Sequence, residues 1–151
     1  MKVFLDTNVF LEYFERRPFH QSVGVLFDAI EEGKIKAVVS TGCVYTLAYL
    51  IRVGFKRQGI YRPEQTERLR ETLATVLSLA TVANISHRRM VDGINDTAFD
   101  DVEDSFQYQC ALQAKCDILV TINLKDYKNA YTSTMEILSP VDMAKRIMTL
   151  Q

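Results

Sequence analysis

The sequence has few cysteines, and none of them is spaced for a metal or redox motif. Its 151 residues contain only three, at Cys43, Cys110 and Cys116. An odd number of cysteines without C-x-x-C spacing argues against a zinc site or a redox centre. We therefore expect three buried thiols in a reducing compartment.

Long apolar runs and an excess of one charge are also absent. No stretch approaches the roughly 18 consecutive apolar residues of a membrane span, and the first residues lack the pattern of a signal peptide. We therefore expect a cytoplasmic protein without a membrane segment. The 18 basic and 19 acidic residues leave a formal charge of -1. This balance does not indicate a polyanionic partner, so any binding of nucleic acid must depend on local patches.

The chain shows no internal repeat, and its 48% apolar content suffices for a single domain over residues 1–151. Five strand-like runs alternate with segments of helical periodicity: Val3–Leu5, Ala37–Val39, Thr81–Ala83, Ile118–Val120 and Glu136–Leu138. This alternation predicts an α/β fold with three α/β/α layers, in which helices cover both faces of a mostly parallel sheet of about five strands.

Capping residues and prolines mark the starts of several helices. Four starts are predicted, at Pro63, Ser86, Asp101 and Ser139-Pro140. The helix that follows Asp101 is expected to run to about Lys115. Loops are expected at residues 54–63, which contain Gly59, and in the polar run 92–97.

Polar residues interrupt the first apolar run at Asp6-Thr7-Asn8, directly after a predicted strand. Two interpretations of this position stay open. Asp6 or Thr7 could cap the next helix by accepting a hydrogen bond from an amide of its first turn. Alternatively, Asp6 is a metal-binding carboxylate, because ligands of open α/β sheets bind beyond the carboxyl ends of the strands.

A second acidic group lies in the segment AFDDVEDSFQYQCALQAKCDILVTINLKDY. Asp101 and Asp104 are three residues apart, so they share one face of the predicted helix. Acids in a first turn also complement the positive end of the helix dipole, which would explain both without any ligand. The strand after this helix is followed by Thr121-Ile122-Asn123 and then by Asp126, so polar oxygen atoms again lie where a strand ends.

These groups are expected to meet at one edge of the sheet. Strands that end at Leu5, Val39 and Val120 would bring Asp6, Ser40 and Asn123 together. Two or three carboxylates and an amide suit Mg²⁺ or Mn²⁺, which prefer oxygen ligands and could activate water for attack on a phosphodiester.

A flavodoxin-like or receiver-type α/β domain, whose acidic pocket also binds Mg²⁺, is an alternative. It would need an Asp after the third strand and a Lys after the fifth. The segments TVANIS and EILSPVD supply neither.

Four segments resemble the PIN-domain nucleases, which include the ribonuclease toxins of bacterial toxin–antitoxin pairs. They are FLDTNVFL, the serine in AVVSTG, the block DDVEDSFQYQCALQAKCDILVTINLKDY and the closing strand-helix segment. The resemblance implies a PIN-like fold, an Mg²⁺ or Mn²⁺ cofactor, an RNA substrate, a possible antitoxin partner and a homodimer. It implies that the catalytic and metal-binding residues are Asp6, Asp101, Asp104 and Asn123. Asp126 is implied as a further metal ligand, and Thr7, Asn8, Ser40 and Thr121 as supporting residues.

The sequence departs from this family at one position. Many members carry a glutamate six residues after the serine that matches Ser40. This chain has Thr46 at that position, and no Asp or Glu occurs between Glu32 and Glu64. A hydroxyl at a supporting position would bind a cation more weakly than a carboxylate. Two functions therefore remain: a metal-dependent ribonuclease, and a PIN-fold module that binds RNA or protein with little catalysis.

A basic segment could contact the nucleic acid. RVGFKRQGIYR carries Arg52, Lys56, Arg57 and Arg62 without an acidic residue. Its cations could hold phosphates while Phe55 and Tyr61 stack on unpaired bases. The alternative is a solvated helix end with its aromatic rings turned inward.

Overall fold

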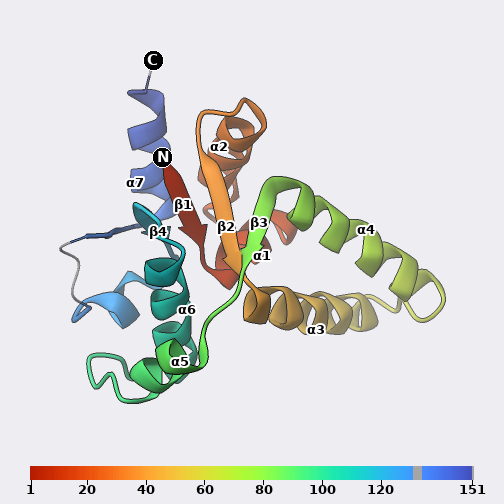
Figure 1. Ribbon diagram of the computed structural model, residues 1–151. Coiled ribbons are helices and arrows are strands. Elements are labelled where there is room, and N and C mark those ends of the chain that lie inside the picture. The colour runs from red at the N-terminus through yellow and green to blue at the C-terminus, as the bar shows by residue number, and fades with distance from the viewer. Residues whose placement is uncertain (131–133, 151) are drawn as a thin grey trace.

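Five parallel strands form the centre of the molecule (Figure 1). The computed structural model describes residues 1–130 and 134–150. The strands are β1 (Lys2–Leu5), β2 (Lys36–Ser40), β3 (Ala80–Ala83), β4 (Ile118–Val120) and β5 (Glu136–Leu138). Their order is β3-β2-β1-β4-β5, and every neighbouring pair is parallel. All five predicted strands are confirmed, with at most one residue added at an end.

Helices cover both faces of the sheet. Two hydrophobic clusters form because successive strand residues point to opposite faces: Val3 and Leu5 belong to one cluster and Phe4 to the other. The first face is covered by α1 (Thr7–Phe14), α2 (His20–Glu31), α3 (Thr41–Arg57), α4 (Glu64–Leu79) and α7 (Pro140–Met148). The second is covered by α6 (Val102–Gln113) and the short 3-10 helix η1 (Leu124–Tyr127), with α5 (His87–Ile94) packed against α6. The three-layer α/β/α architecture is therefore confirmed.

The chain changes direction across the sheet between β1 and β4. From β1 it continues through β2 and β3 on one side, and it then returns to form β4 and β5 on the other. The carboxyl ends of β1 and β4 therefore flank a topological switch point, which is where open α/β sheets bind their ligands.

Two predicted loops are shorter than expected. The α3 helix runs through Gly54 to Arg57, because Phe55 packs against the hydrophobic cluster and holds this last turn. The chain turns at Gly59, whose φ of 77° is accessible to glycine at little cost. The α5 helix likewise includes residues 92–94 of the second predicted loop. Pro63 precedes α4 as its N-cap instead of lying in its first turn.

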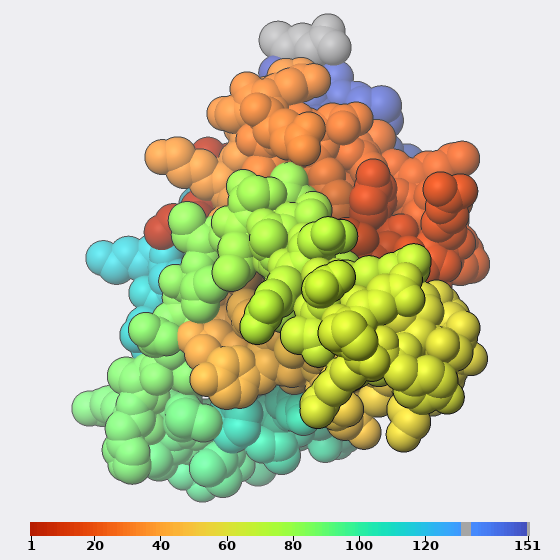
Figure 2. All heavy atoms as spheres, turned by 90° about the vertical axis from the view of Figure 1, so that its right-hand side faces the viewer, coloured from red at the N-terminus to blue at the C-terminus, as the bar shows by residue number. Residues whose placement is uncertain are grey.

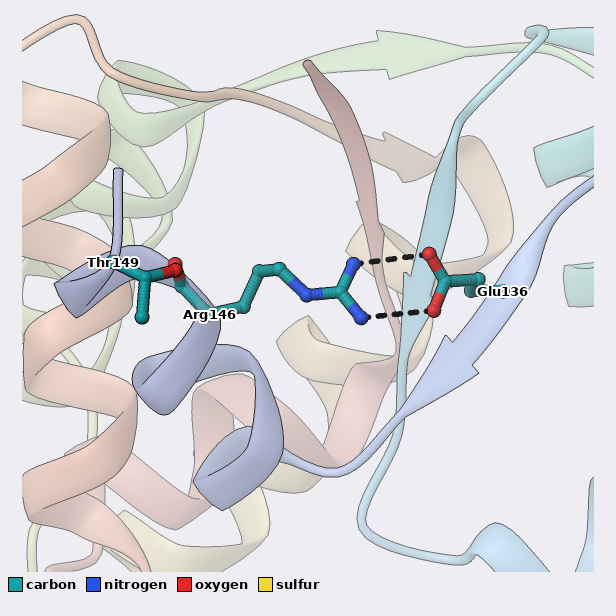
Figure 3. Close-up of polar contacts among 3 residues, drawn as sticks. All are labelled: Glu136, Arg146 and Thr149. Atoms are coloured by element: carbon teal, nitrogen blue, oxygen red, sulfur yellow. Dashed lines mark hydrogen bonds and ion pairs between the residues drawn. The ribbon is translucent and has the colours of Figure 1, made fainter. Parts of the chain in front are cut away.

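An ion pair ties the last helix to the edge of the sheet (Figure 3). The guanidinium of Arg146 on α7 donates two hydrogen bonds of 3.0 Å to the two carboxylate oxygens of Glu136 on β5. These bonds lower the pKa of Glu136 below its ordinary value. Among the described residues, no helix is both long enough and apolar enough to cross a membrane.

Candidate functional site

A cavity of about 480 Å³ opens at the carboxyl ends of the central strands. Its described lining includes five acidic residues and no Lys, Arg or His; the acids are Asp6, Asp101, Glu103, Asp104 and Asp126. The remaining lining combines polar side chains with an apolar wall that includes Leu50, Ile85, Met90 and Phe106. The cavity therefore concentrates negative charge beside an apolar surface.

Asp6 lies at the base of this cavity and is only 4% exposed. One carboxylate oxygen accepts hydrogen bonds from the Thr7 amide at 2.8 Å and the Gln107 side-chain amide at 3.2 Å. The other accepts from the Thr121 hydroxyl at 2.9 Å and the Tyr127 hydroxyl at 3.3 Å. The bond from Thr7 makes Asp6 the N-cap of α1, so the capping interpretation is confirmed. The three tertiary donors show that Asp6 does more than cap a helix.

Gln107 fixes the orientation of Asp6. The Ser40 hydroxyl accepts a hydrogen bond from the Cys43 amide at 2.9 Å and donates to the Gln107 side-chain oxygen at 2.5 Å. The amide nitrogen of Gln107 must therefore face Asp6, since its oxygen is already engaged. The sequence reasoning missed Gln107. The signal was present, because Gln107 follows Asp104 by three residues and therefore shares its face of α6.

Asp104 is half-buried at the first turn of α6. Its pKa is raised to about 7, mainly by desolvation and in addition by the charges of Asp6, Asp101 and Asp126. The Tyr127 hydroxyl lies 3.4 Å from Asp104 and 3.3 Å from Asp6, so one hydroxyl bridges the two carboxylates. Burial and these two charges raise the pKa of Tyr127. The sequence reasoning also missed the contact of Tyr127 with these two acids.

Asp101 has a different environment. It is exposed, and one of its oxygens accepts hydrogen bonds from the amides of Glu103 at 2.8 Å and Asp104 at 3.3 Å. The predicted capping role is confirmed. Asp101 also lines the cavity, where its charge raises the pKa of Asp104.

The other predicted site residues lie close together in the structure. Six line the same cavity: Thr7, Asn8, Ser40, Thr46, Asn123 and Asp126. Thr121 is fully buried beneath them, where its hydroxyl donates to Asp6 and accepts a hydrogen bond from the Asn123 amide at 3.1 Å. The structure therefore brings all the predicted acids and their supporting residues to one place, while their chemical roles stay predictions.

The predicted RNA-binding residues lie outside the cavity lining. Lys56, Arg57 and Arg62 are exposed and Arg52 is half-buried. Phe55 packs inward, as the solvated-helix alternative expects, whereas Tyr61 is exposed.

Whether the site fits a divalent cation depends on its donor atoms. The acids, amides and hydroxyls around the cavity offer the oxygen ligands that Mg²⁺ and Mn²⁺ prefer. Within residues 1–130 and 134–150, however, no three His, Cys, Asp or Glu side chains lie close enough to hold a metal ion together. The donor set therefore fits an ion held by one or two carboxylates and by water, which is a common arrangement for Mg²⁺.

The three cysteines are free and buried, as predicted. Burial raises the pKa of Cys43 to about 12 and of Cys110 and Cys116 to about 11. The thiols therefore stay protonated and unreactive near neutral pH, which leaves the oxygen atoms as the ligands of the site.

Comparisons with known proteins are consistent with this geometry. A family model described as the PIN domain matches residues 2–125. Among solved structures, a chain of VapBC2 from Rickettsia felis, bound to a DNA fragment from their promoter, has a similar fold with a TM-score of 0.63. The two chains are 14% identical, and the match covers 92% of this chain and 98% of that one. No curated protein matches the sequence.

Proposed function

The chain belongs to the PIN domain family, and from this premise we propose that it is a ribonuclease that uses Mg²⁺ or Mn²⁺ to cleave single-stranded RNA. The observation that carries the proposal is the pairing of Asp6 and Asp104 through one tyrosine hydroxyl in a cavity whose described lining has no basic residue. The charge of Asp6 raises the pKa of Asp104, and two carboxylates crowded in this way form a site for a cation.

Asp6 and Asp104 would hold the ion together with water, Asn123 in the same cavity lining would be a further oxygen ligand, and Asp126 would contact the ion through water. Asp6 already accepts four hydrogen bonds, so the ion would compete with the longest of them, the 3.3 Å contact from Tyr127. When bound, Mg²⁺ or Mn²⁺ would supply Lewis-acid stabilisation of the phosphodiester and activation of water. Gln107 and Thr121 keep the Asp6 carboxylate oriented.

Asp104 would also hold or release a proton near neutral pH, because its pKa is raised to about 7. A protonated Asp104 repels neither Asp6 nor an approaching RNA phosphate. An ionised Asp104 provides the second charge that the cation requires. RNA cleavage should therefore increase as the pH rises through this pKa.

We further propose that the protein is the toxin of a cytoplasmic toxin–antitoxin pair and forms a homodimer. The proposal is supported by family membership and by the likeness in fold to a chain of VapBC2. The antitoxin could place an Arg or Lys against the carboxylates, where a cationic side chain would take the position of the metal.

The second candidate is a PIN-fold module that binds RNA or protein with little catalysis. Thr46 favours it, because its neutral hydroxyl lines the cavity. Many PIN-domain nucleases carry a glutamate at the matching position. Fewer carboxylates would weaken the affinity for the cation.

One pair of measurements separates the two candidates. We would titrate Mn²⁺ by calorimetry into the wild type, Asp104→Asn and the control Asp28→Asn, and measure cleavage of a mixed single-stranded RNA pool. Asp28 is exposed on α2 and tests the same change of charge away from the cavity. We expect Asp104→Asn to lose at least about 100-fold in cleavage, since even indirect partners of a metal contribute about 10- to 100-fold. An absence of Mn²⁺ binding to the wild type at millimolar concentration would favour the binding module.

A further inference from the structure

The α3 helix lines the cavity with one face and exposes a second, adjacent face. Gly42, Thr46 and Leu50 are spaced by four residues and line the cavity. The second face carries the exposed Tyr45, Tyr49 and Lys56 together with the half-buried Arg52, and in chain order these residues are four, three and four positions apart. Figure 2 shows the first half of α3, in light orange, reaching the surface between α4 and α5.

The tyrosines on this face are unusually open to solvent. Tyr45 is 75% exposed, more than any other large hydrophobic side chain among the described residues, and Tyr49 is 59% exposed. The guanidinium of Arg52 lies 5.7 Å from the centre of the Tyr49 ring, within the range of a cation–π contact. Neither tyrosine belongs to the hydrophobic clusters of the core, so the aromatic surfaces face outward.

The charge of this face is opposite to that of the cavity. No acidic residue lies between Glu32 and Glu64, so α3 carries only positive charges, at Arg52, Lys56 and Arg57. On the neighbouring α4, Glu64 is already paired with Arg68 at 2.8 Å. A polyanion repelled by the acids of the cavity would therefore find favourable charges on α3.

We propose that this exposed face of α3, defined by Tyr45, Tyr49, Arg52 and Lys56, is a docking track that guides single-stranded RNA into the cavity. Tyr45 and Tyr49 stack on unpaired bases, while Arg52 and Lys56 hold backbone phosphates. The proposal rests on the ribonuclease function proposed above and assigns it a substrate surface. The track is about 16 Å long at the rise of an α-helix, which suits a few nucleotides.

The charge of α3 favours RNA over a protein partner. Tyrosine and arginine are also enriched in protein interfaces, whereas lysine is depleted there, so the aromatic rings alone do not decide between the two. The α3 helix carries three cations and no acid, and cations interleaved with aromatic rings bind single strands without sequence preference.

The test measures RNA binding separately from cleavage. Fluorescence anisotropy of a labelled 12-nucleotide single-stranded RNA would be recorded in EDTA, where metal-dependent cleavage is absent. We expect Tyr45→Ala and Tyr49→Ala each to weaken binding about ten-fold, and Tyr49→Phe to retain it because the ring still stacks. We expect Lys56→Ala to lower the slope of log affinity against log salt concentration by about 1. Lys145→Ala, an exposed charge on α7, is the matched control and should change neither value.

The outcomes distinguish this inference from the proposed function. If the wild type binds RNA through the tyrosines but never cleaves it, the track stands and the nuclease fails. If the wild type cleaves RNA while the alanine variants bind it like the wild type, the track is wrong. A change of oligomeric state in the tyrosine variants, seen by light scattering without loss of RNA affinity, would assign this face to a protein interface and would overturn the proposal. Circular dichroism confirms that each variant is folded.

Discussion

The α1 and α6 helices are both preceded by an aspartate N-cap, but the surroundings of the two aspartates differ. Asp6 caps α1 and Asp101 caps α6, and each accepts a hydrogen bond from a backbone amide of its helix. Asp6 is buried and also accepts from three side chains, whereas Asp101 is exposed and accepts from backbone amides. The same local signal therefore marks an ordinary cap at one helix and the centre of a polar network at the other.

The cause of the difference lies in the sheet. Asp6 follows β1, the central strand, at the switch point, so β4, η1 and α6 all reach it. Asp101 follows a loop at the rim, where its charge raises the pKa of Asp104 less than the charge of Asp6 does. Topology, more than residue type, therefore decides which carboxylate becomes the shared acceptor of the site.

The largest expected effect is that of Asp6→Ala. This change removes the acceptor of Thr121 and leaves Gln107 and Tyr127 only their 3.4 Å contacts with Thr7 and Asp104, so the free energy of unfolding should fall by about 3 kcal/mol. Asp101→Ala removes only a cap and should cost about 1 kcal/mol. Urea denaturation of both variants measures the contrast. Equal losses would show that the network around Asp6 adds nothing beyond the cap.

Gln107→Leu should have the next largest effect. It removes the amide that donates to Asp6 and accepts from Ser40, which should lower the free energy of unfolding by about 1 to 2 kcal/mol. Because Asp6 loses its orientation, Mn²⁺ affinity measured by calorimetry should fall about ten-fold. Gln109→Leu is a useful comparison, since Gln109 lies two residues away on α6 and accepts from Arg89. A ten-fold loss of Mn²⁺ affinity in both variants would contradict a specific role for Gln107.

Asp104→Asn should stabilise the protein in the absence of metal. The folded-state pKa of Asp104 is raised from 3.8 to about 7, so the unfolded state releases this proton first as the pH rises. Wild-type stability should therefore decline between about pH 4 and pH 7. The variant lacks this decline and should be more stable at pH 7.5 by about 1 kcal/mol, a value reduced for solvent screening because Asp104 is half-exposed.

Urea denaturation in EDTA at pH 4 and pH 7.5 tests this prediction. The gain should be present at the higher pH and absent at the lower one, and Asp28→Asn should show no such difference. A variant that is less stable than the wild type at pH 7.5 would contradict the raised pKa.

The smallest effect is expected for Asp101→Asn. Asparagine caps helices about as well as aspartate, so the free energy of unfolding should change by less than about 0.5 kcal/mol. The lost charge should nevertheless lower the pKa of Asp104, since Asp101 contributes to its shift. Carboxyl titration by NMR measures that change. An unchanged Asp104 pKa would separate the two acids and limit Asp101 to capping.

The sequence was sufficient to predict the strands and the acids at their ends. Short apolar runs separated by amphipathic segments identify buried parallel strands, and an Asp or Thr directly after such a run must lie at the carboxyl edge of the sheet. Asp6, Ser40 and Asn123 could be placed together for this reason.

Gln107 and Tyr127 could not be placed in the same way. Gln107 is one of three glutamines in the stretch FQYQCALQ, and the packing of α6 on the sheet decides which of them faces Asp6. Tyr127 belongs to a 3-10 turn, and the direction of its side chain depends on how that turn crosses the second face of the sheet. The end of α3 was misplaced because Gly54 suggests a break that the packing of Phe55 prevents.

The buried cysteines offer a way to follow how the layers separate over time. Cys43 belongs to one hydrophobic cluster, whereas Cys110 and Cys116 belong to the other. A thiol reagent in excess can modify each of them only when the surrounding structure opens. The labelling rate of each cysteine therefore measures how often the structure around it opens. With peptide mapping of the labelled protein, the native sequence would report whether the two sides of the sheet open together or in succession.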